Sequence, residues 1–153
     1  MAAPRISRPL AARSGSAKRA GTRAALAIVL DTWALLALLN DEPAAARVEG
    51  AWQRERPVIC SVNLGEAFYV LIRAHGESAA RKTVGRARAE LTVLDPDWNL
   101  VVEAARTKAV GGLSYADCFA LATARRTGAR LWTGDPELIA IAAQGEIVDL
   151  TSG

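Results

Sequence analysis

Four acidic residues hold positions at which parallel α/β proteins bind ligands: Asp31, Glu66, Asp117 and Asp135. Asp31 directly follows residues 24–30, an apolar run without polar alternation, and Asp135 follows a short predicted strand at residues 129–132. A strand that is apolar throughout is buried on both faces, which is typical of a parallel sheet. Ligands bind in the crevice beyond the carboxyl ends of such strands. If these two strands are neighbours, Asp31 and Asp135 share that crevice.

The other two acids are expected near the beginnings of helices that border the same crevice. Glu66 lies early in a helix that leaves a strand at residues 57–60, and Asp117 lies in the first turn of the helix that leads into strand 129–132. Converging carboxylates repel one another, and such a cluster normally holds a cation. Oxygen ligands without histidine or cysteine favour Mg²⁺ or Mn²⁺. One or two such ions, about 4 Å apart, suit phosphodiester hydrolysis because they activate water and stabilise the leaving oxygen.

Each of these acids also has a simpler structural interpretation. Asp31 is a favourable N-cap for the helix that follows it. Asp117 lies three residues after Ser114, which is the spacing of a capping box. Asp135 precedes a proline and is a good cap as well, and Glu66 suits an exposed helix face. No single acid decides between the two interpretations, whereas the arrangement of all four favours a metal site.

The elements that must position these acids alternate along the chain. Strands are predicted at residues 24–30, 57–60, 91–94, 129–132 and 147–148, and helical segments separate them. Such alternation implies right-handed βαβ crossovers. We therefore predict one three-layer α/β/α domain over residues 24–153, with a mainly parallel central sheet of four to five strands.

The basic charge of the chain is concentrated at its beginning. The net charge is +3, but residues 1–23 contain six basic residues and no acid, so the rest has 13 basic and 16 acidic residues. These 23 residues are interpreted as a flexible tail, as the product of a start codon assigned too early, or as a basic arm that helps to hold RNA. The apolar run at residues 24–39 resembles a signal peptide or membrane span, but Asp31 at its centre argues against both. We expect a cytoplasmic protein.

The cysteines and the histidine give no sign of a zinc site. Cys60 and Cys118 are far apart in the sequence and form no CxxC pair, and His75 is the only histidine. Structural zinc sites need several such ligands at short spacing. The two cysteines are interpreted as buried small side chains in a reducing compartment.

Four short motifs in this order resemble those of PIN-domain nucleases. Residues 30–36, LDTWALL, are similar to the family's opening D-[ST]-x-x-L motif after an apolar strand. Residues 63–67, NLGEA, resemble the second motif with its helical glutamate, and residues 113–122, LSYADCFALA, resemble the third. Residues 132–138, WTGDPEL, match the fourth, and the resemblance covers residues 26–150.

Within this superfamily, the chain looks most like the VapC-type toxins of bacterial toxin–antitoxin pairs. The resemblance implies a PIN-like fold, an endoribonuclease activity that needs one or two Mg²⁺ or Mn²⁺ ions, a homodimer, and inhibition by a small antitoxin. It also implies roles for individual residues. The metal-binding, catalytic acids would be Asp31, Glu66, Asp117 and Asp135. Thr32 and Thr133 would be supporting hydroxyl groups, and Glu137 an outer acid.

The side chains that would hold RNA are less clearly marked. A basic rim for phosphates is predicted from Arg73, Arg81, Lys82 and Arg86. The alternative is that these residues form the solvated faces of two surface helices. Trp33 stands where the family usually has a smaller residue, and its indole would narrow the groove or stack on a base.

Other functional classes fit the same residues less well. A haloacid-dehalogenase-type phosphatase needs an aspartate two residues after its nucleophile, and Trp33 occupies that position after Asp31. A phosphoacceptor receiver domain needs an acidic pair after the first strand, which is absent here. The remaining alternative is a PIN-like module that has lost catalysis and binds an antitoxin or RNA. The presence of all four acids argues against it.

Overall fold

A computed structural model of the chain describes residues 28–143 and 145–152. The predicted basic tail, residues 1–23, and the beginning of the first predicted strand, residues 24–27, lie outside the described residues. The described part of that strand is β1 (Ile28–Leu30), whose three residues are all buried.

A five-stranded sheet forms the centre of the fold. Its strands are β1 (Ile28–Leu30), β2 (Val58–Cys60), β3 (Thr92–Leu94), β4 (Arg130–Thr133) and β5 (Ile147–Asp149). They lie in the order β3-β2-β1-β4-β5, and every neighbouring pair is parallel. The predicted α/β class is confirmed, and β1 and β4 are neighbours as the shared crevice requires.

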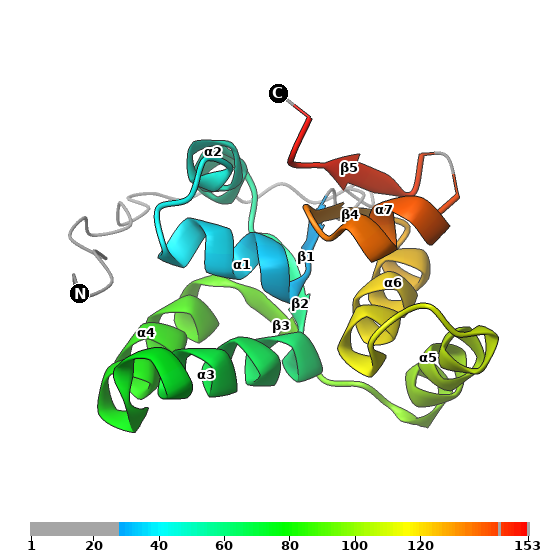
Figure 1. Cartoon of the computed structure of the whole chain (residues 1–153), viewed down its shortest axis with the longest axis horizontal. Helices are drawn as coiled ribbons and strands as arrows, with labels where there is room; N and C mark the ends of the chain where they lie inside the picture. Colours follow the sequence, from blue (N-terminus) through cyan, green and yellow to red (C-terminus); the bar gives the residue numbers. More distant parts are fainter. Residues whose placement is uncertain (1–27, 144, 153) are drawn as a thin grey trace, which may run out of the picture.

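Seven helices surround this sheet in the described part of the chain. They are α1 (Thr32–Leu39), α2 (Ala45–Arg54), α3 (Ser61–His75), α4 (Glu77–Glu90), α5 (Trp98–Val110), α6 (Tyr115–Thr127) and α7 (Pro136–Ile141). In Figure 1, α1 to α4 lie on one side of the strands and α5 to α7 on the other. None of the helices in residues 28–143 and 145–152 is long and apolar enough to cross a membrane.

The two faces of the sheet bury two separate apolar clusters, because successive side chains of a strand point to opposite faces. Ile28 and Leu30 of β1 pack with residues of α1 to α4. Val29, between them in the sequence, packs with residues of α5, α6 and α7 on the other face. Both faces of β1 are therefore covered, which explains its wholly apolar sequence and confirms the predicted three layers.

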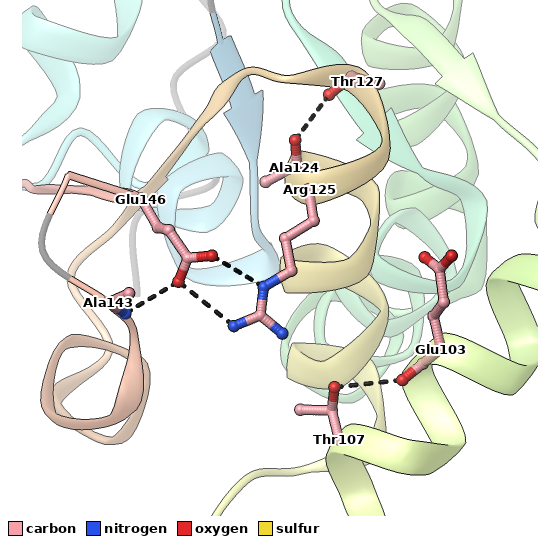
Figure 2. A network of polar contacts seen from close by, with 7 residues as sticks. All are labelled: Glu103, Thr107, Ala124, Arg125, Thr127, Ala143 and Glu146. Carbon is pink, nitrogen blue, oxygen red and sulfur yellow. Dashed lines mark hydrogen bonds and ion pairs between the residues drawn. The ribbon is translucent and has the colours of Figure 1, made fainter.

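The edge strand β5 is tied to the helix layer by one arginine–glutamate pair (Figure 2). Arg125 of α6 donates to both carboxylate oxygens of Glu146, from Nε at 2.9 Å and from a terminal nitrogen at 3.3 Å. The same carboxylate accepts from the backbone N–H of Ala143 at 2.8 Å. This pairing raises the pKa of Arg125 and lowers the pKa of Glu146. It links the residue directly before β5 to α6.

Candidate active site

The carboxyl ends of β1 and β4 bring Asp31 and Asp135 to the same edge of the sheet. Leu30 lies opposite Trp132 in the parallel register, and the Asp31 amide donates to the Trp132 carbonyl at 3.4 Å. Asp31 caps α1, since its side chain accepts from the Ala34 amide at 2.7 Å. Asp135 caps α7. The capping interpretation of both acids is therefore correct, and both caps lie at the carboxyl ends of neighbouring strands.

Asp117 belongs to a capping box at the start of α6, as its spacing from Ser114 predicts. The Ser114 hydroxyl donates to the Asp117 carboxylate at 2.5 Å, and the Asp117 amide donates to that hydroxyl at 3.1 Å. The Ser114 amide donates to the same carboxylate oxygen, Oδ2, at 3.3 Å. These bonds hold the half-buried Asp117 side chain in the first turn of α6.

Three carboxylates from α6 and α7 form the tightest acidic group. Asp117, Asp135 and Glu137 each offer one oxygen atom, and these atoms all lie within 4.8 Å of one another. Sequence reasoning gave Glu137 only an outer position, but the structure places it beside Asp117 and Asp135. Glu137 lies in the first turn of α7, two residues after the N-cap Asp135, and its backbone amide donates to the Asp135 carboxylate at 2.8 Å.

The Thr133 hydroxyl joins Asp31 to Asp135. It donates to the Oδ2 atom of Asp31 and accepts from the Asp135 amide at 2.9 Å. Thr133 is fully buried, and Asp31 is only 1% exposed. A single hydroxyl group therefore orients one buried carboxylate and the backbone that carries a second.

One basic side chain acts on the charges of this site: Lys108 lowers the pKa of Asp117, but by less than burial raises it. Burial raises the pKa of Asp31 to about 7, and the nearby Asp117 and Asp135 add to the rise, while hydrogen bonds from Thr133 and Ala34 oppose it. Burial and the charge of Asp135 also raise the pKa of Asp117. Among the residues that the structure describes, no ion pair involves these acids. A crowded set of carboxylate oxygens suits a divalent cation that binds oxygen ligands.

Glu66 of α3 is linked to the start of α1 through a second threonine. The Thr32 hydroxyl donates to the Oε2 atom of Glu66 at 2.5 Å. Both residues lie within the part of the fold where α1 packs on α3. Glu66 is half-buried, so the structure removes the alternative of a fully exposed helix residue. The structure links it to Thr32 and does not include it in the tight group of three acids.

Asn63 is a residue of this site that sequence reasoning missed. It is fully buried, and its Nδ2 atom donates to the Thr32 hydroxyl at 3.3 Å and to the Ala116 carbonyl at 3.0 Å. The signal that could have found it is its position three residues before Glu66, which puts both on one face of α3. An asparagine in a helix carries no charge, so its residue type alone does not mark a metal or catalytic site.

Trp33 lies against the backbone that links Thr133 to Asp135. A Cβ atom added to Gly134 would lie less than 3.0 Å from three carbons of the Trp33 ring. The half-buried indole therefore packs on Gly134, which is itself buried. Only a residue without a side chain fits between this ring and the strand end. The predicted contact of Trp33 with a base stays a prediction.

The predicted RNA-binding residues lie along α3 and α4, outside the acidic group. All four are exposed: Arg73, Arg81, Lys82 and Arg86. Arg73 comes seven residues after Glu66, which corresponds to about 10 Å along a helix. Arg81 pairs with Glu77 at 2.5 Å and lies over the Phe68 ring at 5.9 Å.

Comparison with known proteins identifies the family. Residues 28–144 match the PIN domain family. This chain is a PIN-domain protein. Ribonuclease VapC30 of Mycobacterium tuberculosis is 33% identical over 110 residues, which cover 66% of this chain and 84% of that protein. Ribonuclease VapC of Mycolicibacterium smegmatis is 33% identical over 114 residues, with 66% and 85% covered. The chain belongs to the VapC ribonucleases within the PIN-domain family.

Solved structures confirm the PIN-like fold. The sarcin–ricin loop cleaving toxin VapC20 of Mycobacterium tuberculosis has a TM-score of 0.62 at 19% identity, covering 74% of this chain and 94% of that one. A chain of a toxin–antitoxin complex from Klebsiella pneumoniae has a TM-score of 0.64 at 18% identity, covering 81% and 98%. In this PIN domain, the acids lie at the carboxyl edge of the sheet, where the strand order reverses between β1 and β4.

Proposed function

We propose that this PIN-domain protein is a metal-dependent endoribonuclease that acts as the toxin of a toxin–antitoxin pair. The observation that carries the proposal is the group of Asp117, Asp135 and Glu137 within 4.8 Å, beside the buried Asp31. Its VapC relatives are named ribonucleases. The acids of this site form no ion pair within the described part of the chain, which favours this activity over an inactive binding module.

The residues of the site fit one or two Mg²⁺ or Mn²⁺ ions. Asp117, Asp135 and Glu137 would hold an ion directly, and Asp31 and Glu66 would complete the set of oxygen ligands. When bound, the metal activates water and stabilises charge on the phosphoryl group. The Thr133 hydroxyl would hold the Asp31 carboxylate in place by its hydrogen bond, and the Thr32 hydroxyl would hold that of Glu66. The protein itself would contribute orientation of its acids and exclusion of bulk water around Asp31.

The proposal extends to partners and location. The Klebsiella pneumoniae structure is a toxin–antitoxin complex, and we expect a small antitoxin to bind this chain and to block its acidic crevice. We also expect a homodimer that works in the cytoplasm. RNA would reach the crevice across α3 and α4, where basic side chains are exposed.

The first test is cleavage of total bacterial RNA, followed by sequencing of the new 5′ ends. We expect discrete cuts with Mg²⁺ or Mn²⁺, none with a chelator, and none from Asp117→Asn. The matched control is Asp97→Asn, which removes a carboxylate that caps α5 and pairs with Arg126 in the last turn of α6, at the opposite end of that helix from Asp117. It is expected to retain cleavage. Absence of cuts from antitoxin-free protein over many RNAs would favour the binding module.

A second prediction concerns salt dependence. Changing Arg81, Lys82 and Arg86 to glutamine should weaken the binding of single-stranded RNA and flatten its dependence on salt. Each lost phosphate contact lowers the slope of log K against log salt by about 0.7 for single strands, so the triple variant should lose about 2.

The binding is best measured by fluorescence anisotropy in an Asp117→Asn background, which prevents cleavage. Arg106→Gln is the control, because Arg106 is also exposed but lies on α5, across the sheet. An equal loss of slope in Arg106→Gln, or none in the triple variant, would contradict the predicted basic rim.

A further inference from the structure

One buried amide connects three of the helices that carry the site. Asn63 lies on α3 with no exposed surface, and its Nδ2 atom reaches both α1 and α6. The α1 partner is the hydroxyl of Thr32, and the α6 partner is the carbonyl of Ala116. Ala116 directly precedes Asp117 in the sequence. A single side chain therefore spans the helices that bear Glu66 and Asp117.

The hydrogen bonds of this amide can run in only one direction. A backbone carbonyl is purely an acceptor, so the nitrogen of Asn63 must face Ala116. Its second N–H then donates to the Thr32 oxygen at 3.3 Å. The Thr32 hydroxyl has two acceptors within reach, the Oε2 atom of Glu66 at 2.5 Å and the backbone carbonyl of Asn63 at 3.2 Å. The shorter bond, to a carboxylate, is the stronger of the two. The result is a chain of donors from Asn63 through Thr32 to the Glu66 carboxylate.

Stability alone does not explain an asparagine at this position. A buried polar group is unfavourable unless it is fully hydrogen-bonded. The Oδ1 atom of Asn63 has no hydrogen-bond partner among the described residues. An apolar side chain in this place would leave no such atom buried. What an apolar side chain cannot do is donate hydrogen bonds to the Thr32 hydroxyl and the Ala116 carbonyl at the same time.

We propose that Asn63 is a positioning residue that fixes Glu66 relative to Asp117 and so sets the affinity of the site for a divalent cation. The inference rests on the proposed function, since it concerns the same acids. Asn63 acts on Glu66 through the Thr32 hydroxyl, and on the first turn of α6 through the Ala116 carbonyl. Residues that orient metal ligands in this way typically change metal affinity by 10- to 100-fold when they are lost.

The test measures Mn²⁺ binding to RNA-free protein by electron paramagnetic resonance. Asn63→Ala is expected to raise the Mn²⁺ dissociation constant 10- to 100-fold and to lower kcat at saturating metal by less, with KM for RNA little changed. Thr32→Val removes the hydroxyl group that links Asn63 to Glu66, so it should weaken Mn²⁺ binding by a similar factor. Because both variants interrupt one path, the double variant should be no worse than the stronger single one.

Thr123→Val is the matched control. Thr123 is as fully buried as Asn63, and its hydroxyl also has no hydrogen-bond partner among the residues that the structure describes, but it lies on α6 six residues after Asp117 and bonds to none of the site residues there. It should leave the Mn²⁺ dissociation constant unchanged, so a loss of affinity specific to Asn63→Ala and Thr32→Val cannot come from core damage in general.

The outcomes separate the two proposals. If the wild-type protein binds no Mn²⁺, the proposed metal-dependent activity fails. If the wild type binds Mn²⁺ and both variants bind it equally well, the positioning role of Asn63 is overturned while the proposed function stands. Should Asn63→Ala not fold, Thr32→Val alone decides, because an unchanged dissociation constant in that variant also overturns the inference.

Discussion

Replacing Asp31 by asparagine is expected to stabilise the metal-free protein and to abolish metal-dependent cleavage. The Asp31 carboxyl is 1% exposed, and its pKa is raised to about 7, mainly by burial. Ionising such a group at pH 8 costs up to about 4 kcal/mol relative to the unfolded chain. Asparagine removes this cost and can still accept the hydrogen bond from the Ala34 amide. Its carboxamide supplies no negative charge for a cation, so activity is lost.

The stabilisation expected from Asp31→Asn depends on pH, and its direction follows from the raised pKa of Asp31. The Asp31 carboxyl is protonated up to about pH 7 in the folded protein but only up to about pH 4 in the unfolded chain. Between these values the folded state binds more protons, so stability falls as pH rises. The metal-free wild type should therefore melt at a lower temperature at pH 8 than at pH 5, and Asp31→Asn should reduce this difference. Thermal denaturation in chelator measures it.

Asp97→Asn is the control for this prediction. Asp97 also caps a helix, accepting from the Leu100 amide at 2.9 Å, but it is exposed and pairs with Arg126 at 2.8 Å. These interactions hold the pKa of Asp97 below its usual value. Asp97→Asn should therefore lower the melting temperature. If Asp31→Asn lowers it as well, and leaves stabilisation by Mn²⁺ unchanged, Asp31 is only a cap.

Gly134→Ala is expected to be strongly destabilising, although it adds a single methyl group. The new Cβ atom would overlap three carbons of the Trp33 ring. The ring belongs to a residue in the first turn of α1, and Gly134 lies between Thr133 and Asp135, so either the indole or the strand end must move. Overpacking of this kind costs about 1–3 kcal/mol. The displacement should also reduce cleavage, because Asp135 follows directly.

The double variant Trp33→Ala/Gly134→Ala tests whether overlap with the Trp33 ring causes the destabilisation. Once the ring is removed, the second change should cost little, so the two effects are expected to be strongly non-additive in urea denaturation. Gly85→Ala is the control, because Gly85 lies in α4 with nothing within 4 Å of an added Cβ atom. It should stabilise the protein by about 1 kcal/mol. If the two changes in the free energy of unfolding simply add, Gly134 is needed for a reason other than the Trp33 ring.

The local features of the site could be predicted from the sequence because each depends on a few neighbouring residues. The caps at Asp31, Asp117 and Asp135 follow from spacings of two or three residues, and all three are present in the structure. The apolar run that ends at Leu30 predicts a strand buried on both faces for the same reason. The order of the motifs was enough to indicate the family.

Only the tertiary structure decided which side chains meet. The contact of Thr133 with Asp31 joins residues about a hundred positions apart, and it exists because β4 pairs with β1. The links from Asn63 to Thr32 and Ala116 likewise depend on how α3 packs between α1 and α6. Local spacing carries no information about such contacts, because they depend on strand order and helix packing. The acids could therefore be chosen from the sequence, whereas the hydroxyl and amide groups that orient them could not.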